Sequence, residues 1–189
     1  ENNQVYAVLY VSSDVTKEIA SIKKIEQEEE ALRSAVEIAE MGTWSTDIAT
    51  GITTVSKRHA EMFGFKHTTL HIEEARSVIK KSDYNRVTTA FAAAQQKNTG
   101  GKYESEYKII NGITGQEHII HSVGQTHFNE EGIPLKISGT AKDITLQREL
   151  QLALQNEVNL RTSELANVLE KLKDSNKELA QSNHALKHS

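Results

Sequence analysis

"SGTAKDITLQREL", residues 138–150, runs from a strand-like segment directly into a charged helical segment. The same order occurs in YVSSDVTKEIASI, residues 10–22, so Asp-(Ile/Val)-Thr stands twice between a strand pattern and a helix pattern. Asp and Thr at a helix start accept hydrogen bonds from free backbone N–H groups, and the Asp charge is favoured at the positive end of the helix dipole. We therefore predict a stiff strand-to-helix connection, called the joint from here on, made of Asp143, Ile144 and Thr145.

The composition excludes several classes of function. The chain has 189 residues, a net charge of −4 and no cysteine. This charge gives no electrostatic reason to expect nucleic acid or an anionic membrane surface as a partner. No apolar run approaches the roughly 20 residues that cross a bilayer. We therefore predict no nucleic-acid partner, no direct membrane contact, and a reducing compartment such as the cytoplasm.

Glycine and proline divide the chain into a middle part and two flanks. All ten glycines lie between Gly42 and Gly139, and the only proline is Pro134. The flanks have no helix breaker and are predicted as long helices over residues 15–40 and 146–189. Between them, strand and helix patterns follow in the order β-β-α-α-α-β-β-β. This order predicts an α+β fold in which helices cover one face of a five-stranded antiparallel sheet.

The C-terminal flank repeats apolar residues every seven positions, with acidic and basic residues mixed between them. Such a repeat is typical of the a and d positions of a coiled coil, although several d positions here are polar. A helix that packs on its own domain is the alternative. The strict repeat without aromatic residues or glycine favours a parallel two-stranded coiled coil, and hence a homodimer. The predicted seam is formed by Leu154, Val158, Leu165, Val168, Leu172, Leu179 and Leu186.

Several short motifs of the middle part follow each other in the order found in PAS domains. The first strand reads Gly-x-Trp-x-x-Asp, a helix ends in Gly-Phe, a later strand reads Glu-Tyr-Lys-Ile, and the exit reads Gly-x-x-x-Asp-Ile-Thr. Over about residues 35–147 the chain resembles the PAS subclass that opens with Gly-x-Trp-x-x-Asp. It departs from that pattern at residues 81–83, where Lys-Ser-Asp replaces His-Pro-x-Asp, and at Ile119, where a Trp is frequent. The matching positions are Gly42, Trp44, Asp47, Gly64, Phe65, Glu106, Tyr107, Lys108, Ile109, Gly139, Asp143, Ile144 and Thr145.

The resemblance implies a division of the chain into four parts. Residues 1–14 resemble the last strand and exit motif of a preceding PAS domain, and residues 15–40 would be the linker helix between the two domains. Residues 41–145 would form the PAS domain itself. Residues 146–189 resemble the signalling helix that leads to the kinase core of a sensor histidine kinase.

The resemblance also implies a function for the longer protein. The chain starts without Met and enters a strand at once, so we expect it to be a non-catalytic piece of a longer bacterial protein. That protein would autophosphorylate with ATP and act on a response regulator in a two-component phosphorelay, whether or not it is anchored in a membrane. Two alternatives stay open: another output, such as a diguanylate cyclase or a chemoreceptor-type module, and a small-molecule-binding domain that dimerises through its helices.

A small-molecule pocket is expected between the sheet and the helices, although the same residues can form an ordinary core. No cofactor is expected, and the flavin adduct of light-sensing PAS relatives is excluded because it needs a cysteine. No metal site is expected, since His118 and His121 point to opposite faces of a regular strand. The expected pocket residues are Trp44, Phe63, Phe65, Ile79, Val87, Phe91, Tyr107, Ile109, Ile119 and Val123.

Overall fold

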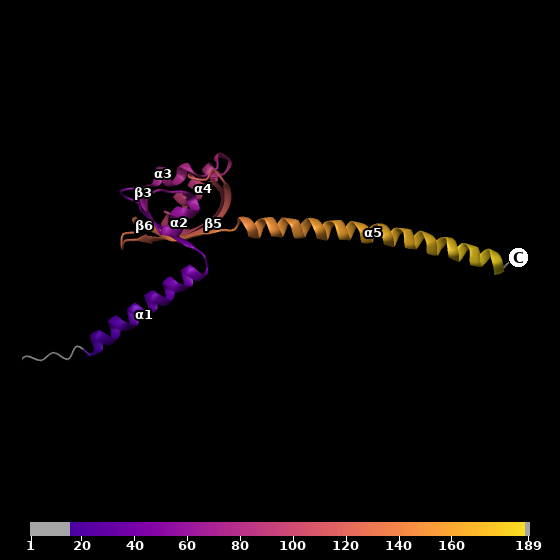
Figure 1. The fold of residues 1–189 in the computed structure, drawn as a ribbon, viewed down its shortest axis with the longest axis horizontal. Helices are drawn as coiled ribbons and strands as arrows, with labels where there is room; N and C mark the ends of the chain where they lie inside the picture. The colour runs from indigo at the N-terminus through magenta and orange to yellow at the C-terminus, as the bar shows by residue number, and fades with distance from the viewer. Residues whose placement is uncertain (1–15, 188–189) are drawn as a thin grey trace, which may run out of the picture.

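The computed structural model describes residues 16–187 as one sheet, a layer of short helices and two long helices (Figure 1). The predicted exit strand over residues 1–14 lies outside the described residues. The strands are β1 (Gly42–Asp47), β2 (Ile52–Val55), β3 (Thr69–His71), β4 (Lys102–Ile110), β5 (Glu117–Phe128) and β6 (Pro134–Asp143). The helices are α1 (Thr16–Ile38), α2 (Lys57–Phe63), α3 (Ile72–Ser77), α4 (Lys81–Ala93), the 3₁₀ turn η1 (Lys97–Thr99) and α5 (Thr145–Lys187).

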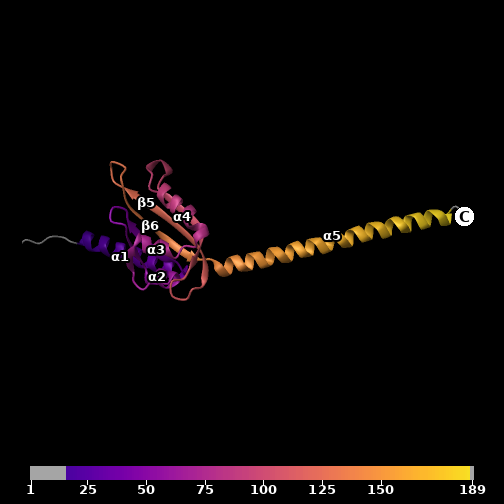
Figure 2. The ribbon, with the colours of Figure 1, turned by 90° about the horizontal axis from the view of Figure 1, so that it is seen from above.

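The strands form one antiparallel sheet in the order β3-β2-β1-β6-β5-β4. Helices α2, α3 and α4 lie on one face of it (Figures 1 and 2). This confirms the predicted α+β fold. The sheet has one strand more than the five predicted, because β3 is only three residues long and pairs at the edge with β2. An alternating pattern cannot be recognised over so few residues.

The core lies between the helices and the inward face of the three long strands. Ile109, Ile120 and Ile137 come from β4, β5 and β6, and each is 0% exposed. Polar side chains on the same face are buried as well, including Ser122 and Thr126 on β5. Because side chains alternate along a strand, these positions define which residues of β5 point inward and which point outward.

Trp44 on β1 is placed over the centre of the sheet by a hydrogen bond and by two glycines. Its Nε1 donates to Ser122 Oγ at 3.1 Å. Its ring lies against Gly124, where a Cβ atom would come within 2.8 Å of the ring carbons. Gly139 pairs with Gly124 in the sheet, and a Cβ there would lie 1.9 Å from the carbonyl oxygen of Val123. The two glycines therefore allow β5 and β6 to approach each other beneath the indole.

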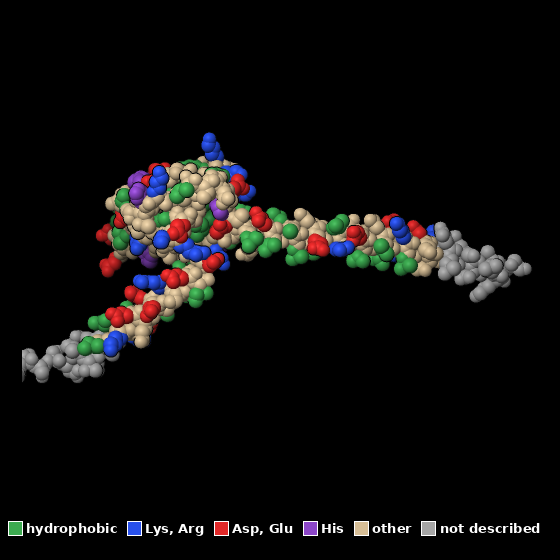
Figure 3. Space-filling view, viewed as in Figure 1, with side chains coloured by type: hydrophobic (Ala, Val, Ile, Leu, Met, Phe, Trp, Pro, Cys, Tyr) green, Lys and Arg blue, Asp and Glu red, His purple; other side chains and the backbone are tan. Residues whose placement is uncertain are grey.

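Two long helices project from the domain in different directions (Figures 1 and 2). Helix α5 has 43 residues, which corresponds to about 65 Å at the usual rise per residue. Hydrophobic side chains lie on the surface of both helices (Figure 3). Among the described residues, no helix is long and apolar enough to cross a membrane. Most large apolar side chains of α1, and those of α5 up to Leu172, are thus exposed in the single chain.

The close approach of β5 and β6 leads to a first prediction. We expect Gly139→Ala to lower the free energy of unfolding by about 2–3 kcal/mol, because the new Cβ meets backbone atoms that cannot move without opening the sheet. Urea unfolding followed through the fluorescence of Trp44, the only tryptophan, measures the change. Gly115→Ala is the control, since nothing lies within 4 Å of a Cβ there. Its only expected loss is about 1 kcal/mol of stability, because Gly115 has a left-handed backbone conformation that alanine adopts less readily. Equal losses in the two variants would contradict the prediction.

Candidate functional site

Strand β6 passes into helix α5 through one residue, Ile144, which is 7% exposed. Its backbone N–H donates to the carbonyl of Ile119 on β5 at 2.8 Å, as a residue of the sheet does. Its carbonyl accepts from the N–H of Arg148 at 2.9 Å, which is the first helical hydrogen bond of α5. Ile144 is therefore bonded to the sheet on one side and to the helix on the other, with no free residue between them.

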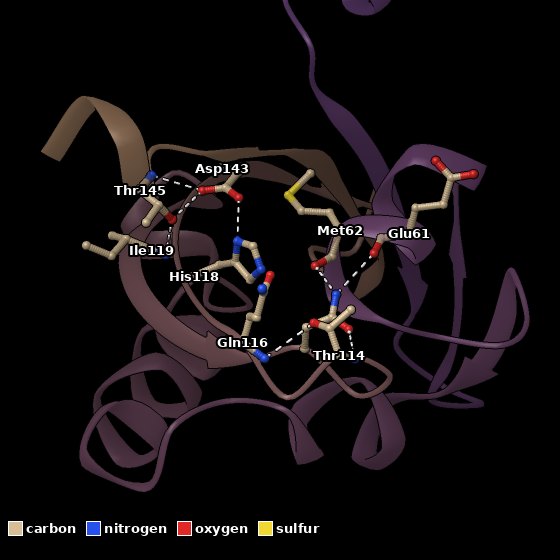
Figure 4. Close-up of polar contacts among 9 residues, drawn as sticks. Glu61, Met62, Thr114, Gln116, His118, Ile119, Asp143 and Thr145 are labelled. Carbon is tan, nitrogen blue, oxygen red and sulfur yellow. Dashed lines mark hydrogen bonds and ion pairs between the residues drawn. The ribbon is translucent and has the colours of Figure 1, made fainter. Parts of the chain in front are cut away.

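Asp143 and Thr145 stand on either side of Ile144 in the chain, and their side chains bond to each other and to residues of β5 (Figure 4). Asp143 Oδ1 accepts from the backbone N–H of Thr145 at 2.9 Å and from its hydroxyl at 2.5 Å. The same hydroxyl oxygen accepts from the N–H of Ile119 at 2.8 Å. His118 Nδ1 lies 2.7 Å from Asp143 Oδ2. The predicted joint residues thus meet each other and two consecutive residues of β5.

The carboxyl group of Asp143 is held in its charged form. Partial burial would raise its pKa, but the hydrogen bonds from Thr145 and the contact with His118 outweigh burial, so the pKa lies below its ordinary value of 3.8. A carboxylate at this position satisfies a free N–H of the first helical turn and faces the positive end of the helix dipole. The charge of Asp143 therefore supports the start of α5.

A second attachment joins α5 to the sheet. Arg148 Nε donates to Glu106 Oε1 at 2.9 Å, and Arg148 Nη2 donates to Glu106 Oε2, so the contact is bidentate. Glu106 lies on β4, beyond β5, and the hydrogen bonds from Arg148 lower its pKa. The sequence did not identify this pair, because the two residues are 42 positions apart. The first turn of α5 is thus attached to both β5 and β4.

A polar cleft of about 400 Å³ opens beside the joint. Its walls come from the end of the linker, from α2, from the β4–β5 turn and from the joint. Asn111 holds the turn against α2, since its Nδ2 donates to the carbonyls of Glu61 and Met62 at 3.2 and 3.0 Å (Figure 4). Across the cleft, Arg58 forms an ion pair with Glu40 at 3.5 Å. The segment that enters the domain, at Glu40, and the segment that leaves it, at Asp143, therefore line the same cleft.

The predicted seam residues lie on α5, as the sequence required. Five of them are exposed by half or more: Leu154, Val158, Leu165, Val168 and Leu172. Leu179 and Leu186 fall within the bounds of α5, but their side chains are outside the part of the chain whose burial is described. Arg161 occupies the polar d position seven residues after Leu154, and it forms an ion pair with Glu164 at 3.1 Å.

Inside the domain, a cavity of about 80 Å³ lies between the sheet and the helices. Six of the ten expected pocket residues line it: Trp44, Phe63, Ile79, Val87, Phe91 and Tyr107. Residues that were not expected complete the lining, among them His59, Arg76, Tyr103 and Ser122. The sequence missed them because polar and titratable side chains are not chosen by a search for apolar positions.

Four expected pocket residues do not line this cavity. Ile109 points inward but is fully enclosed by the core, and Phe65 packs against the core from its edge. For Ile119 and Val123 the prediction was wrong by one residue. Ile120 and Ser122 are the buried positions of β5, so Ile119 and Val123 lie on the opposite face, and Val123 is 37% exposed.

His59 is a titratable group buried in the cavity wall, and its pKa departs strongly from the ordinary value. It is 6% exposed and stacks on Phe63 with the ring centres 4.0 Å apart. Its Nδ1 has no hydrogen-bond partner among the described residues. Burial lowers its pKa from 6.5 to about 4. The imidazole is therefore neutral at physiological pH.

Comparison with known families identifies the fold. The family model described as PAS fold matches residues 52–141, which run from the start of β2 to Ala141, two residues before the end of β6. This part of the chain has the PAS fold. Strand β1 and the joint flank the matched PAS segment on either side and complete its sheet and its exit.

Two solved structures share this PAS fold. One is a sensory box histidine kinase/response regulator from Burkholderia thailandensis E264, with 24% identity, a TM-score of 0.58, and coverage of 69% of this chain and 97% of that chain. The other is the N-terminal domain of a diguanylate cyclase with a PAS/PAC sensor from Marinobacter aquaeolei, with 15% identity, a TM-score of 0.51, and coverage of 57% and 98%. At these identities the likeness establishes the fold alone. No curated protein matches the chain in sequence.

We expect Asp143→Ala to lower the free energy of unfolding by about 1–2 kcal/mol, since it removes a side chain that caps α5. Because the pKa of Asp143 is lowered in the folded protein, the stabilisation is complete above the unfolded pKa near 4 and is lost as the pH falls through the folded value. Urea unfolding at pH 7 and at pH 2 measures both. The control is Glu149→Ala, an exposed acidic residue of the same helix start. A difference between Asp143→Ala and the unchanged protein that persists fully at pH 2 would contradict this assignment.

His59 predicts a loss of stability in mild acid. Its pKa is about 4 in the folded protein and near 6.5 when exposed, so the unfolded chain binds a proton that the folded one excludes. Stability should therefore fall as the pH drops from 6.5 to 4, by up to about 3 kcal/mol. We expect His59→Leu to remove most of this dependence in urea titrations, whereas His67→Leu, at an exposed position, should retain it. A pH dependence unchanged in His59→Leu would show that another group causes it.

Proposed function

We propose that this chain is the sensory or relay module of a two-component sensor histidine kinase. In this proposal the PAS domain passes a change in its sheet through the joint to α5, and two α5 helices of a homodimer carry it onward. The single observation that carries the proposal is the double role of Ile144, which gives its N–H to the sheet and its carbonyl to the helix. A connection without a free residue transmits a change in strand direction instead of absorbing it.

The proposed homodimer rests on the exposed seam of α5. In the single chain, leucine and valine side chains repeat every three or four residues along a helix that contacts the domain only near its start (Figure 3). Burial in a parallel coiled coil would remove these side chains from water and place the two signalling helices side by side. The charge of Arg161 at the seam is matched by Glu164 one turn further on.

The proposed output is autophosphorylation by a kinase core that follows α5, with transfer to a response regulator. The Burkholderia structure is that of a sensory box histidine kinase/response regulator, which agrees with this output. The Marinobacter structure is a domain of a diguanylate cyclase and favours the second candidate, a cyclase output. Both outputs use a non-catalytic PAS domain and consume nucleoside triphosphates, so we place the chain in the cytoplasm.

A ligand-binding role for the PAS domain is proposed only for the interior cavity. Aromatic residues, the buried His59 and Arg76 line it, which is the mixture of apolar walls and few polar groups found in small-molecule sites. Its volume of about 80 Å³ is small for a cofactor. The absence of cysteine excludes a flavin adduct through a thiol.

The decisive experiment measures autophosphorylation by the longer protein that contains this chain. We expect Asp143→Ala to change the rate of phosphate incorporation from ATP by about fivefold or more in either direction, since allosteric coupling energies are typically 1–3 kcal/mol. The assay is run below the temperature at which the variant unfolds, and Glu149→Ala is the control. An unchanged rate would refute the role of the joint. Production of a cyclic dinucleotide from GTP, without phosphate incorporation, would establish the second candidate instead.

A further inference from the structure

The first two turns of α5 carry two exposed leucines that the predicted heptad leaves out. Leu146 is 68% exposed and Leu150 is 62% exposed. If the heptad of Leu154 and Val158 continued towards the joint without interruption, its next positions would be Gln151 and Gln147. The apolar residues at the start of the helix therefore lie one position away from the expected seam.

The spacing of the apolar residues accounts for this offset. Leu146, Leu150, Leu154 and Val158 follow each other at intervals of four, after which intervals of three and four alternate as in a regular heptad. These three intervals of four stand where a regular heptad has four, three and four, so the seam contains one extra residue, and such a register break locally unwinds a left-handed coiled coil. The register break falls between Leu150 and Leu154, in the second and third turns of α5.

The side chains at the joint independently indicate the same seam. Arg148 is bound to Glu106 of its own sheet, and its Nη1 donates to Gln151 Oε1 at 2.7 Å. Residues of a helix lie about 100° apart, so Gln151 is about 60° around the axis from Arg148, whereas Leu150 is about 160° away. The Gln151 side is thus turned towards the attachment to the domain. Leu146 and Leu150 face away from it, where a second helix can approach.

We propose that α5 pairs with α5 of a second copy of this chain along Leu146, Leu150, Leu154 and Val158, with a register break of one residue between Leu150 and Leu154. This inference rests on the proposed homodimer and adds its register at the joint. The paired helices then meet within one turn of Asp143–Thr145. The locally unwound segment directly after the joint is where a change in the direction of α5 is taken up.

A second copy is the occupant that the surface itself specifies. Exposed leucines and valines continue from this stripe into the seam up to Leu172, with Arg161 as the charged position between Val158 and Leu165, so one helix partner covers both parts. No other described element lies beside α5 beyond its first turns, and α1 leaves the domain in another direction (Figures 1 and 2). A two-fold axis along the helix pair places identical leucines opposite each other, as a parallel coiled coil requires.

The chain has no cysteine, so single-cysteine variants report the register directly. Each variant of the full chain is oxidised mildly, and the disulfide-linked dimer is quantified on non-reducing gels. We expect Leu146→Cys and Leu150→Cys to form at least about fivefold more dimer than Gln147→Cys and Gln151→Cys, because a disulfide forms only between closely facing Cα atoms. Leu152→Cys is the matched control, since Leu152 is 64% exposed but lies off both seams. Val158→Cys, Leu165→Cys and Leu172→Cys report the coiled coil itself.

The outcomes separate this inference from the proposed dimer. Strong cross-linking at Val158, Leu165 and Leu172 together with Leu146 and Leu150 supports both. Cross-linking at those three positions together with Gln147 and Gln151 retains the dimer and overturns the register break. Cross-linking at those three positions alone also overturns it, because the helices would then be apart at the joint. Absence of cross-linking at every position would refute the dimer and the inference together.

Discussion

The backbone of Ile144 is the constraint on which the rest of the arrangement depends. A hinge needs residues whose backbone angles can change without loss of hydrogen bonds. At this joint, the N–H and carbonyl of Ile144, the N–H of Thr145 and the N–H of Ile119 are all bonded within one small network. Ile144 and Thr145 are also β-branched, which restricts their side-chain rotamers. The direction of β6 therefore determines the direction in which α5 leaves the domain.

The two attachments of α5 differ in what they contribute. The capping of the helix by Asp143 is partly buried and supports stability. The bidentate pair of Arg148 and Glu106 has side chains that are 37% and 38% exposed, and a pair so accessible to water contributes at most about 1 kcal/mol. Its geometry fixes the rotation of the first turn of α5 relative to β4. An interaction of this size can hold one orientation and still be exchanged for another in a signalling transition.

The sequence predicted the features that depend on neighbouring residues. The distribution of glycine separated the domain from its helical flanks, and Asp143–Thr145 identified the joint before any contact was known. The partners of the joint could not be found in this way. His118 lies 25 positions from Asp143, and Glu106 lies 42 positions from Arg148, so strand register alone brings them together.

Strand β5 shows why the sequence predicted some of the cavity residues and chose the wrong ones on this strand. Ile119 and Ile120 are adjacent, so an apolar pattern does not tell which of them faces the helices. The polar residue Ser122 decides it, because its hydroxyl accepts the indole N–H of Trp44 inside the core. His59 escaped recognition for a related reason, since a lone histidine in a short helix gives no sign that it will be enclosed and neutral.

The cavity and the joint share one strand pair, and this limits how any ligand could act. Ser122 lines the cavity and donates to the carbonyl of Thr140 on β6 at 3.3 Å. Three residues earlier on β5, about 10 Å away, Ile119 binds the joint. A ligand larger than the cavity of about 80 Å³ must displace part of its lining, and displacement of Trp44 breaks its bond to Ser122. This bond joins β1 to β5, and the Ser122 hydroxyl is also bonded to Thr140 on β6, so such a ligand would reach the β5–β6 contact through Ser122. A ligand in the cavity would disturb the β5–β6 contact at Ser122, whereas a signal that arrives at the joint would disturb it at Ile119. The two routes would therefore differ only in the residue of β5 that is affected first.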